Sequence, residues 1–327
     1  MKAVQIGTAG HAFYAYKAIK NYGLDFAALS CGSAGIAAEG TEAALEVVKK
    51  RGFAPKLYDN YITMLDEERP DIAIVNPQFT ENADVAIAAL ERGIHVFCEK
   101  PLAPDLASLD RLDAACKASK ARLAAMFGIR YEAPFVTAKR LVDAGEIGEI
   151  RLMDSRKSYK LGKRPAFYSS RKTYCGILPW VAIHGIDWMR WFSGEHYTKV
   201  YAAHSSRENG GNGDMDITSF ATYEMTNGVL ATITADMFRP ASAPSHGDDR
   251  VRLVGTKGIL EITDGALTLL SDAAGGKVNV PLDPPKDIFA DFLEELLHGV
   301  PCDCGAEASI ESTRWALLAR DFAERAE

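Results

Sequence analysis

Short apolar runs alternate with longer amphipathic segments over residues 1–125 of the chain. The apolar runs have the length of buried strands, and they cover 3–6, 26–29, 72–75, 94–97 and 123–127. The segments between them have helical spacing, and they cover 14–20, 41–50, 83–92 and 106–119. This alternation predicts an α/β fold with a doubly wound parallel sheet, which binds ligands at the carboxyl ends of its strands.

After residue 130 the pattern is that of a second, mostly antiparallel domain. The turn Thr226-Asn227-Gly228 carries the Asn-Gly hairpin signal between two alternating segments. The predicted strands begin at 150 and continue over 217–225, 229–237, 250–254, 258–262 and 267–270, and the predicted helices cover 134–144, 183–191 and two segments after 288. We expect two domains, 1–125 with the parallel sheet and 126–327 with an α+β fold on a mostly antiparallel open sheet.

Composition narrows the class of protein. The chain has 327 residues, 47% of them hydrophobic, and a net charge of -7, which argues against general affinity for nucleic acid or anionic membranes. No apolar run reaches the roughly 18 residues of a membrane span, and the start lacks the pattern of a signal peptide. The six cysteines have no paired metal-ligand spacing. We expect a cytoplasmic protein with reduced thiols and no metal.

The turn after the first predicted strand is a variant of the G-x-G-x-x-G dinucleotide fingerprint, with alanine in place of two glycines. It consists of Gly7, Thr8, Ala9, Gly10, His11 and Ala12. Because it follows a strand and begins a helix, its N–H groups and the helix dipole can bind a pyrophosphate. An ordinary tight turn is the alternative, but the position favours binding of a dinucleotide.

The end of the second predicted strand bears on the choice of cofactor. A carboxylate that binds the adenosine ribose is expected there, but the sequence has Ser30 and Ser33 instead. Without an acid to repel a 2'-phosphate, NADP is at least as plausible as NAD. We predict an adenosine ribose near these serines and a slight preference for NADP.

Five short segments together give the chain a resemblance to a known family. Cys98-Glu99-Lys100-Pro101 follows the fifth predicted strand, and the others are Asn76-Pro77-Gln78, Phe127-Gly128-Ile129-Arg130-Tyr131, Gly145-Glu146-Ile147-Gly148 and His184-Gly185-Ile186-Asp187. With the turn at Gly7, they resemble the glucose-fructose oxidoreductase / inositol dehydrogenase (Gfo/Idh/MocA) family in type, order and spacing. The resemblance covers nearly the whole chain and implies a Rossmann domain that binds NAD or NADP.

The resemblance also implies roles for individual residues. Lys100 would contact the nicotinamide ribose and the substrate hydroxyl, and Pro101 would follow a cis peptide. His184 would be the acid/base, a role that suits a group titrating near neutral pH. An ammonium at Lys100 would stabilise a developing alkoxide. The other residues carried over are Asn76, Pro77 and Glu99 for the cofactor, and Arg130 and Asp187 for the substrate.

Two departures from the family pattern concern the substrate. Trp180 stands where the family commonly has an aspartate, four residues before His184, and Asn82 replaces a histidine. If a helix begins near Trp180, the indole shares a face with His184 and can stack on a sugar ring. A basic and aromatic stretch over 159–172 either lines a pocket for an acidic sugar or phosphate or forms a surface loop.

The predicted function is an NAD(P)-dependent oxidoreductase that acts on a sugar, inositol or related polyol. Two alternatives stay open, a regulatory protein that senses dinucleotide without turnover and a redox-neutral, NAD-dependent glycosidase. An open sheet face in the second domain suits pairing of subunits, so we expect a homo-oligomer, either a dimer or a tetramer. The expected partner is a small sugar-like molecule.

Overall fold

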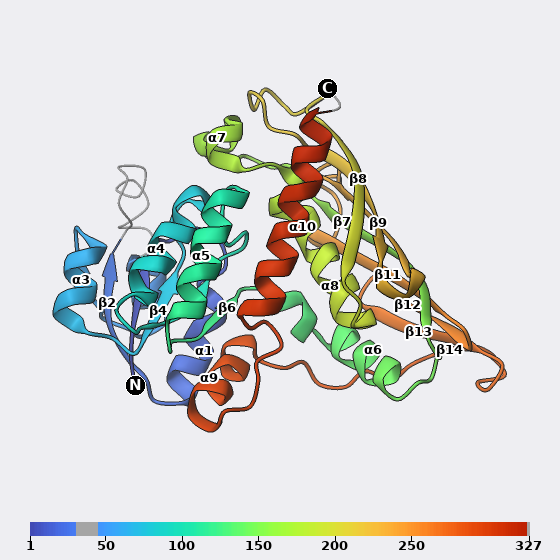
Figure 1. Cartoon of the computed structure of the whole chain (residues 1–327), viewed down its shortest axis with the longest axis horizontal. Coiled ribbons are helices and arrows are strands. Elements are labelled where there is room, and N and C mark those ends of the chain that lie inside the picture. The colour runs from blue at the N-terminus through green and yellow to red at the C-terminus, as the bar shows by residue number, and fades with distance from the viewer. Residues whose placement is uncertain (31–44, 326–327) are drawn as a thin grey trace. The chain divides into compact units, whose positions relative to one another are not determined.

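The computed structural model describes residues 1–30 and 45–325 (Figure 1). The chain forms two compact units, each made of two segments. Unit 1 contains Met1–Gly128 and Asp287–Thr313, and unit 2 contains Ile129–Lys286 and Arg314–Glu327. The first segment ends near the predicted domain boundary at 125, but residues 287–313, expected in the second domain, group with the first.

Unit 1 is built on a six-stranded sheet in the order β3-β2-β1-β4-β5-β6, with every pair of strands parallel. Its strands are β1 Lys2–Ile6, β2 Asp25–Ser30, β3 Lys56–Tyr58, β4 Ile72–Val75, β5 His95–Cys98 and β6 Leu123–Ala125. Its helices are α1 Phe13–Asn21, α3 Tyr61–Glu68, α4 Asn82–Leu90, α5 Leu106–Ala118 and α9 Ile288–His298. The predicted doubly wound parallel sheet is confirmed.

Burial explains why these segments form the centre of unit 1. All four residues of β4 are apolar and buried, as expected for a strand covered on both faces. Asn60 and Asp105 cap α3 and α5 with side-chain oxygens that accept backbone N–H groups. Residues 45–50 are helical, and the rest of the helix predicted over 41–50 lies outside the described residues.

Unit 2 is built on an eight-stranded sheet in the order β14-β13-β12-β11-β7-β10-β9-β8. Its strands are β7 Ile150–Tyr159, β8 Tyr197–Ser205, β9 Thr218–Met225, β10 Leu230–Asp236, β11 Gly247–Gly255, β12 Gly258–Thr263, β13 Ala266–Ser271 and β14 Gly276–Asn279. Only the β7–β10 pair is parallel among its described pairs. The predicted, mostly antiparallel sheet is confirmed, and so is the β9–β10 turn with Asn227 at φ 55°.

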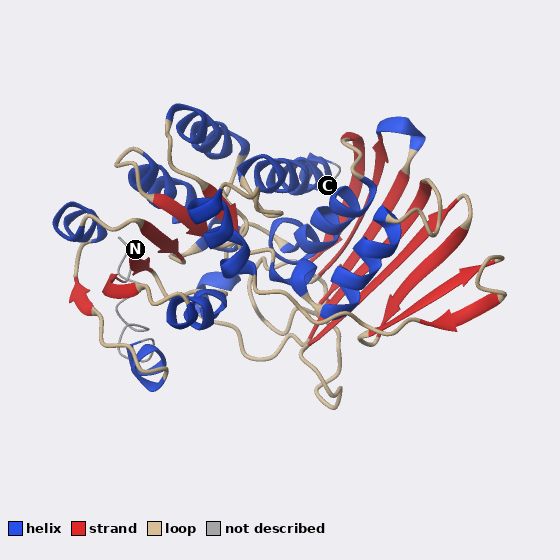
Figure 2. Cartoon of the chain, turned by 90° about the horizontal axis from the view of Figure 1, so that it is seen from below, coloured by secondary structure: helices blue, strands red, loops and turns tan. Residues whose placement is uncertain are grey.

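Helices cover one face of this sheet (Figure 2). The helices of unit 2 are α6 Ala133–Asp143, α7 Arg171–Tyr174, α8 Ile183–Ser193 and the later part of α10 Ala306–Arg325. The shorter helical turns of the chain are η1 Phe79–Glu81, η2 Gly128–Tyr131, η3 Ala166–Ser169, η4 Leu178–Ala182 and η5 Thr226–Gly228. Alternate residues of β9 are buried and exposed, so the opposite face is open. Within the described ranges, no helix is long and apolar enough to cross a membrane.

Candidate active site

The turn after β1 packs against the end of β4. The N–H of Gly7 donates to the Ser30 carbonyl at 2.7 Å, and the φ of Gly7 is 81°. A Cβ on Gly7 would lie 2.1 Å from the Asn76 carbonyl oxygen and 2.3 Å from the Pro77 nitrogen. This approach requires a glycine, so the first glycine of the predicted fingerprint has a clear physical reason.

Asn76 connects the same turn to β4. Its carbonyl accepts the N–H of Ala9 at 2.9 Å, and its side-chain amide donates to the Ala9 carbonyl at 3.0 Å. Its Oδ1 and the Oγ of Ser30 are buried oxygens without a hydrogen-bond partner in the described part of the chain. The Ala12 side chain offers no oxygen to cap α1. These unsatisfied groups lie where a dinucleotide would need them, so the residues present fit that cofactor.

Glu99 closes the turn from the end of β5. Its carboxylate accepts the N–H of His11 at 2.5 Å and lies 3.0 Å from Nδ1 of the same residue. A Cβ on Gly10 would lie 2.1 Å from that carboxylate. Burial acts to raise the pKa of Glu99, but His11 and Lys100 outweigh it and hold the pKa below its ordinary value. The structure therefore brings together Gly10, His11 and Glu99, all three of which the sequence predicts to bind the cofactor.

Lys100 lies in a buried turn that Asn82 supports. The Lys100–Pro101 peptide is cis, as the resemblance implies, and Lys100 is buried. The Asn82 side-chain amide donates to the Glu99 carbonyl at 3.0 Å and to the Pro101 carbonyl at 2.8 Å, one on each side of Lys100. Sequence reasoning treated Asn82 only as a substitution; an amide at the start of α4, beside the edge where β4 and β5 end, was the available signal.

His184 and Asp187 lie on the first turns of α8 in unit 2. The His184 ring is buried and stacks with Trp188 at 6.3 Å. Asp187 accepts both Nε and Nη2 of Arg130, with Nε to Oδ2 at 2.5 Å, and both residues are buried. The guanidinium also lies 5.5 Å from the Trp191 ring. The two predicted substrate residues thus bind each other, and their contact with substrate stays a prediction.

Trp180 lies in a π-helical turn and not in a regular α-helix. This turn, Leu178–Ala182, precedes α8, which begins at Ile183. The helical segment does begin near Trp180, but its first turn is π-helical, so the four-residue spacing to His184 does not by itself put both on one face. The indole is 7% exposed and meets the Tyr168 ring edge-on at 6.2 Å. π-turns are frequent at functional sites, and the contact of Trp180 with substrate stays a prediction.

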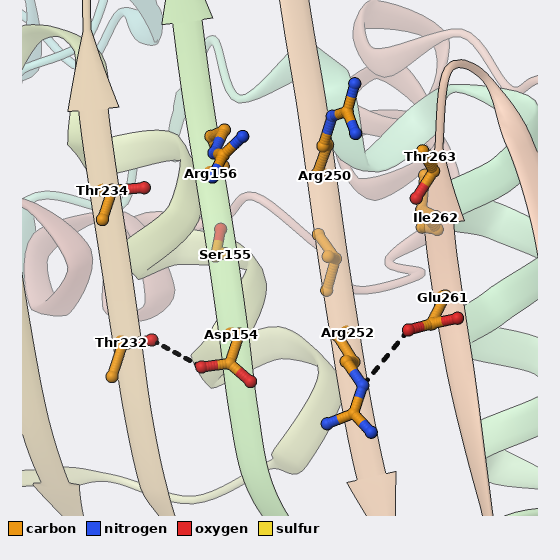
Figure 3. Close-up of a pocket in the computed structure, with 11 residues that line it drawn as sticks. Asp154, Ser155, Arg156, Thr232, Thr234, Arg250, Arg252, Glu261, Ile262 and Thr263 are labelled. Atoms are coloured by element: carbon orange, nitrogen blue, oxygen red, sulfur yellow. Dashed lines mark hydrogen bonds and ion pairs between the residues drawn. The ribbon is translucent and has the colours of Figure 1, made fainter.

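A shallow groove of about 350 Å³ lies on the open face of the eight-stranded sheet of unit 2, opposite the face that the helices cover (Figure 3). Its polar side chains come from four neighbouring strands: Asp154, Arg156, Thr232, Thr234, Arg250, Arg252, Glu261 and Thr263. Several bind one another, such as Thr232 to Asp154 at 2.8 Å and Arg252 to Glu261 at 3.2 Å. The groove lies across the sheet from α8, so it is separate from the surroundings of His184.

Ser33, predicted near the ribose, is outside the described residues.

Comparison with known proteins gives consistent results for both halves of the chain. Residues 2–127 match the family described as an oxidoreductase family with an NAD-binding Rossmann fold, and residues 135–261 match the GFO/IDH/MocA C-terminal domain. Inositol 2-dehydrogenase of Salmonella typhimurium is 28% identical over 274 residues, which cover 81% of this chain and 77% of the relative.

Solved structures share the fold over the whole length. An oxidoreductase from Thermotoga maritima is 38% identical with a TM-score of 0.95, covering 100% of this chain and 99% of its own. An oxidoreductase from Agrobacterium radiobacter, in complex with NAD+, L-tartaric acid and magnesium, has a TM-score of 0.83 at 14% identity and covers 100% and 97%. At that identity the second structure shows the fold alone.

Proposed function

The chain belongs to the Gfo/Idh/MocA family and is an NAD(P)-dependent dehydrogenase that acts on CH–OH groups, and from this premise we propose that it oxidises or reduces a sugar, inositol or related polyol. The observation that carries the proposal is the Lys100 turn, which Asn82 supports through the carbonyls of Glu99 and Pro101. A lysine with so constrained a backbone suits a reacting group better than a solvated side chain. Similarity to an inositol 2-dehydrogenase supports the polyol.

In the proposed reaction each residue has a separate task. The nicotinamide, when bound, supplies a hydride acceptor or donor. His184 takes the proton of the reacting hydroxyl during oxidation and returns it during reduction. Lys100 stabilises the negative charge that develops on the hydroxyl oxygen, as a fixed ammonium does in a water-poor site. Arg130 and Asp187 hold α8, and hence His184, through their ion pair.

The cofactor would be bound by the turn from Gly7 to Ala12 together with Asn76, Pro77 and Glu99. The buried Oγ of Ser30, which lacks a partner among the described residues, supports an adenosine ribose or its 2'-phosphate nearby. We propose a slight preference for NADP over NAD on this ground, because a hydroxyl can donate to a phosphate. Calorimetry with NADPH and NADH tests this: strong discrimination for NADH contradicts the preference.

The assembly and the compartment are parts of the same proposal. The open face of the sheet in unit 2 supports a homo-oligomer, a dimer or tetramer, in which that face is covered. Cys98 and Cys116 are free thiols, and burial raises the pKa of both, to about 11 for Cys116. Unreactive thiols suit a reducing cytoplasm. Light scattering on the purified chain measures the oligomeric state.

One experiment tests the function as a whole. Sugars, inositols and sugar acids are incubated with the enzyme and with NAD or NADP, and reduced nicotinamide is followed by absorbance. Net turnover of at least one polyol supports the proposal. Bound cofactor without net turnover would favour one of two alternatives. One is a dinucleotide-sensing protein, which the loss of the family aspartate at Trp180 supports, and the other is a redox-neutral glycosidase. A glycoside hydrolysis assay then separates these two.

A further inference from the structure

Two cations of unit 2 have no carboxylate partner within the described residues. Lys160 follows β7 directly, and its ammonium donates to the carbonyls of Ala241 and Ala243. Arg164 donates through Nη2 to the Lys160 carbonyl at 2.9 Å, and its buried Nε has no acceptor in the described ranges. Neutral carbonyls satisfy hydrogen bonds but leave both charges uncompensated. These cations belong to the basic and aromatic stretch for which the sequence left two alternatives.

His246 lies beside these cations. Its carbonyl accepts the N–H of Lys160 at 3.1 Å, and its ring stacks on Tyr159 at 4.9 Å. Burial, followed by Arg164, Lys157 and Lys160, lowers the pKa of His246. Arg164 and Lys160, which have no carboxylate partner in the described ranges, therefore act on this ring together with Lys157. We call Lys160 and Arg164 the cationic group, and the His246 ring lies beside it.

The neighbouring Lys157 shows what a compensated cation looks like in the same place. It lies on the helix-covered face of β7, is buried, and pairs with Asp249. Burial lowers the pKa of Lys157, whereas Asp249 and Glu132 act to raise it. Arg164 contrasts with Lys157, since the described residues provide no such acid for it, and an anionic ligand would therefore be stabilised at the cationic group.

Aromatic side chains connect the cationic group to the surroundings of His184. The Arg164 guanidinium lies 5.4 Å from the Tyr168 ring, which contacts Trp180 at 6.2 Å. On the other side, the Lys157 ammonium lies 4.8 Å from the ring of Tyr159 and 5.8 Å from that of Trp188. Trp188 in turn stacks with His184. The second series of contacts reaches the predicted acid/base inside unit 2, and the first reaches Trp180, the residue predicted to contact the substrate.

The charges near His184 also favour an anion. The family aspartate four residues before the histidine is replaced by Trp180, which removes one negative charge. Asp187 is neutralised by Arg130. A negatively charged substrate would meet fewer carboxylates beside this histidine than the family pattern would place there.

We infer that the polyol substrate carries an anionic group, a carboxylate or a phosphate, which binds Arg164 and Lys160 while His184 acts on a hydroxyl of the same molecule. The inference rests on the proposed function and names the substrate class of that site. A guanidinium binds either anion through paired N–H groups, and a poorly solvated cation gains most from such a partner. Both anions share this chemistry, and the experiment distinguishes them.

The test compares ligands that differ only at one carbon. Binding of D-glucose, D-glucuronate and D-glucose 6-phosphate, and of the same three forms of D-galactose, is measured by calorimetry on the whole enzyme with NADP present. We expect at least one acid or phosphate to bind at least about tenfold more tightly than its neutral sugar, the effect of one charge-assisted contact. A preference for the acid or for the phosphate identifies the anion.

Variants connect that preference to the cationic group. Arg164→Met should abolish the preference for the anion and leave the neutral sugar unchanged, whereas Arg164→Lys should retain part of it. Arg156→Met is the matched control, since Arg156 is exposed on the open face of the same sheet. Melting temperatures establish that each variant is folded. If Arg164→Met fails to fold, the preference for the anion is measured in Lys160→Met and Arg164→Lys instead.

The outcomes separate this inference from the proposed function because binding does not depend on turnover. Equal affinity for neutral and anionic forms, no binding of any anion, or an unchanged preference in the Arg164 variants overturns the inference. Turnover of neutral polyols alone would leave the proposed function standing without the anionic substrate. Preferential binding of the anion without hydride transfer would support the anionic ligand and contradict the proposed function.

Discussion

Arg130 and Asp187 lie 57 positions apart in the sequence and form a paired hydrogen bond inside unit 2, with exposed side-chain fractions of 2% and 0%. Removing either partner leaves the other charge buried and alone. We expect Asp187→Asn and Arg130→Met each to lower the free energy of unfolding by about 3–5 kcal/mol. Urea unfolding measures this change.

The exposed pair Lys199–Glu224 on β8 and β9 is the control. Lys199→Met should cost less than about 1 kcal/mol, the usual range for an ion pair in solvent. A double variant of Arg130 and Asp187 should cost less than the sum of the single variants. Small losses for both single variants would contradict the view that this pair holds α8.

Lys100 and His184 should be required for turnover. Lys100→Met and His184→Ala are expected to lower kcat by about two or more orders of magnitude, because one loses charge stabilisation and the other the acid/base. Affinity for the cofactor, measured by calorimetry, should fall more in Lys100→Met than in His184→Ala. Near-normal turnover in either variant would show that its proposed role is wrong.

Trp180 is predicted to stack on the substrate ring. Trp180→Phe should raise KM several-fold with little change in melting temperature, because phenylalanine preserves apolar packing but provides a smaller stacking surface and no N–H donor. Trp188, which is buried and packs on Phe135 at 4.7 Å, is the comparison for a core tryptophan. If Trp180→Phe lowers the melting temperature as Trp188→Phe does and leaves KM unchanged, the indole is a packing residue.

Asn82 should act on catalysis through the Lys100 turn. Asn82→Ala and Asn82→Asp remove the two donated hydrogen bonds, and the aspartate also faces two carbonyls with a negative charge. We expect kcat to fall about tenfold or more, since small displacements of a reacting group are costly, with a smaller change in KM. Asn82→His, which restores one donor, should recover part of kcat. Exposed Asn279 serves as the control for an asparagine-to-alanine change.

Acid should weaken the contribution of Glu99 to stability. Since the folded-state pKa of Glu99 is lowered, its stabilisation is complete above the ordinary glutamate pKa of about 4.3 and is lost as pH falls through the folded-state value. The wild-type melting temperature should therefore fall relative to that of Glu99→Gln between about pH 5 and 3. Exposed Glu91→Gln should follow the wild type, and parallel curves for Glu99→Gln would contradict the assignment.

Much of the parallel sheet was predictable because its strands are buried on both faces. The segment predicted as 72–75 is β4 residue for residue. β1 is one residue longer than the predicted run 3–6, and β2 is longer than the predicted run 26–29 by one residue at each end. β8 was not predicted, since this strand lies at the edge of its sheet and only Tyr197 and Ala202 in it are buried. Edge strands lack the apolar alternation that sequence reasoning detects.

The site was predictable where residues follow one another and not where the fold brings them together. The turn at Gly7 and the Lys100 segment are local patterns that directly follow β1 and β5, the two strands on either side of β4. The contact of Asn82 with Glu99 spans 17 residues and that of Arg130 with Asp187 spans 57. Each of these residue types has many other roles, so only the folded chain identifies its partner.

The discontinuous units limit how this protein can be recombined with its relatives. The chain passes between the units at three places, after residues 128, 286 and 313, and the third place lies within α10. A chimera with a single junction near 128 would receive α9 from one parent and the sheet it accompanies from the other. Exchange of a whole unit, and with it a change of cofactor or substrate, requires three matched junctions, one of them in the middle of a helix.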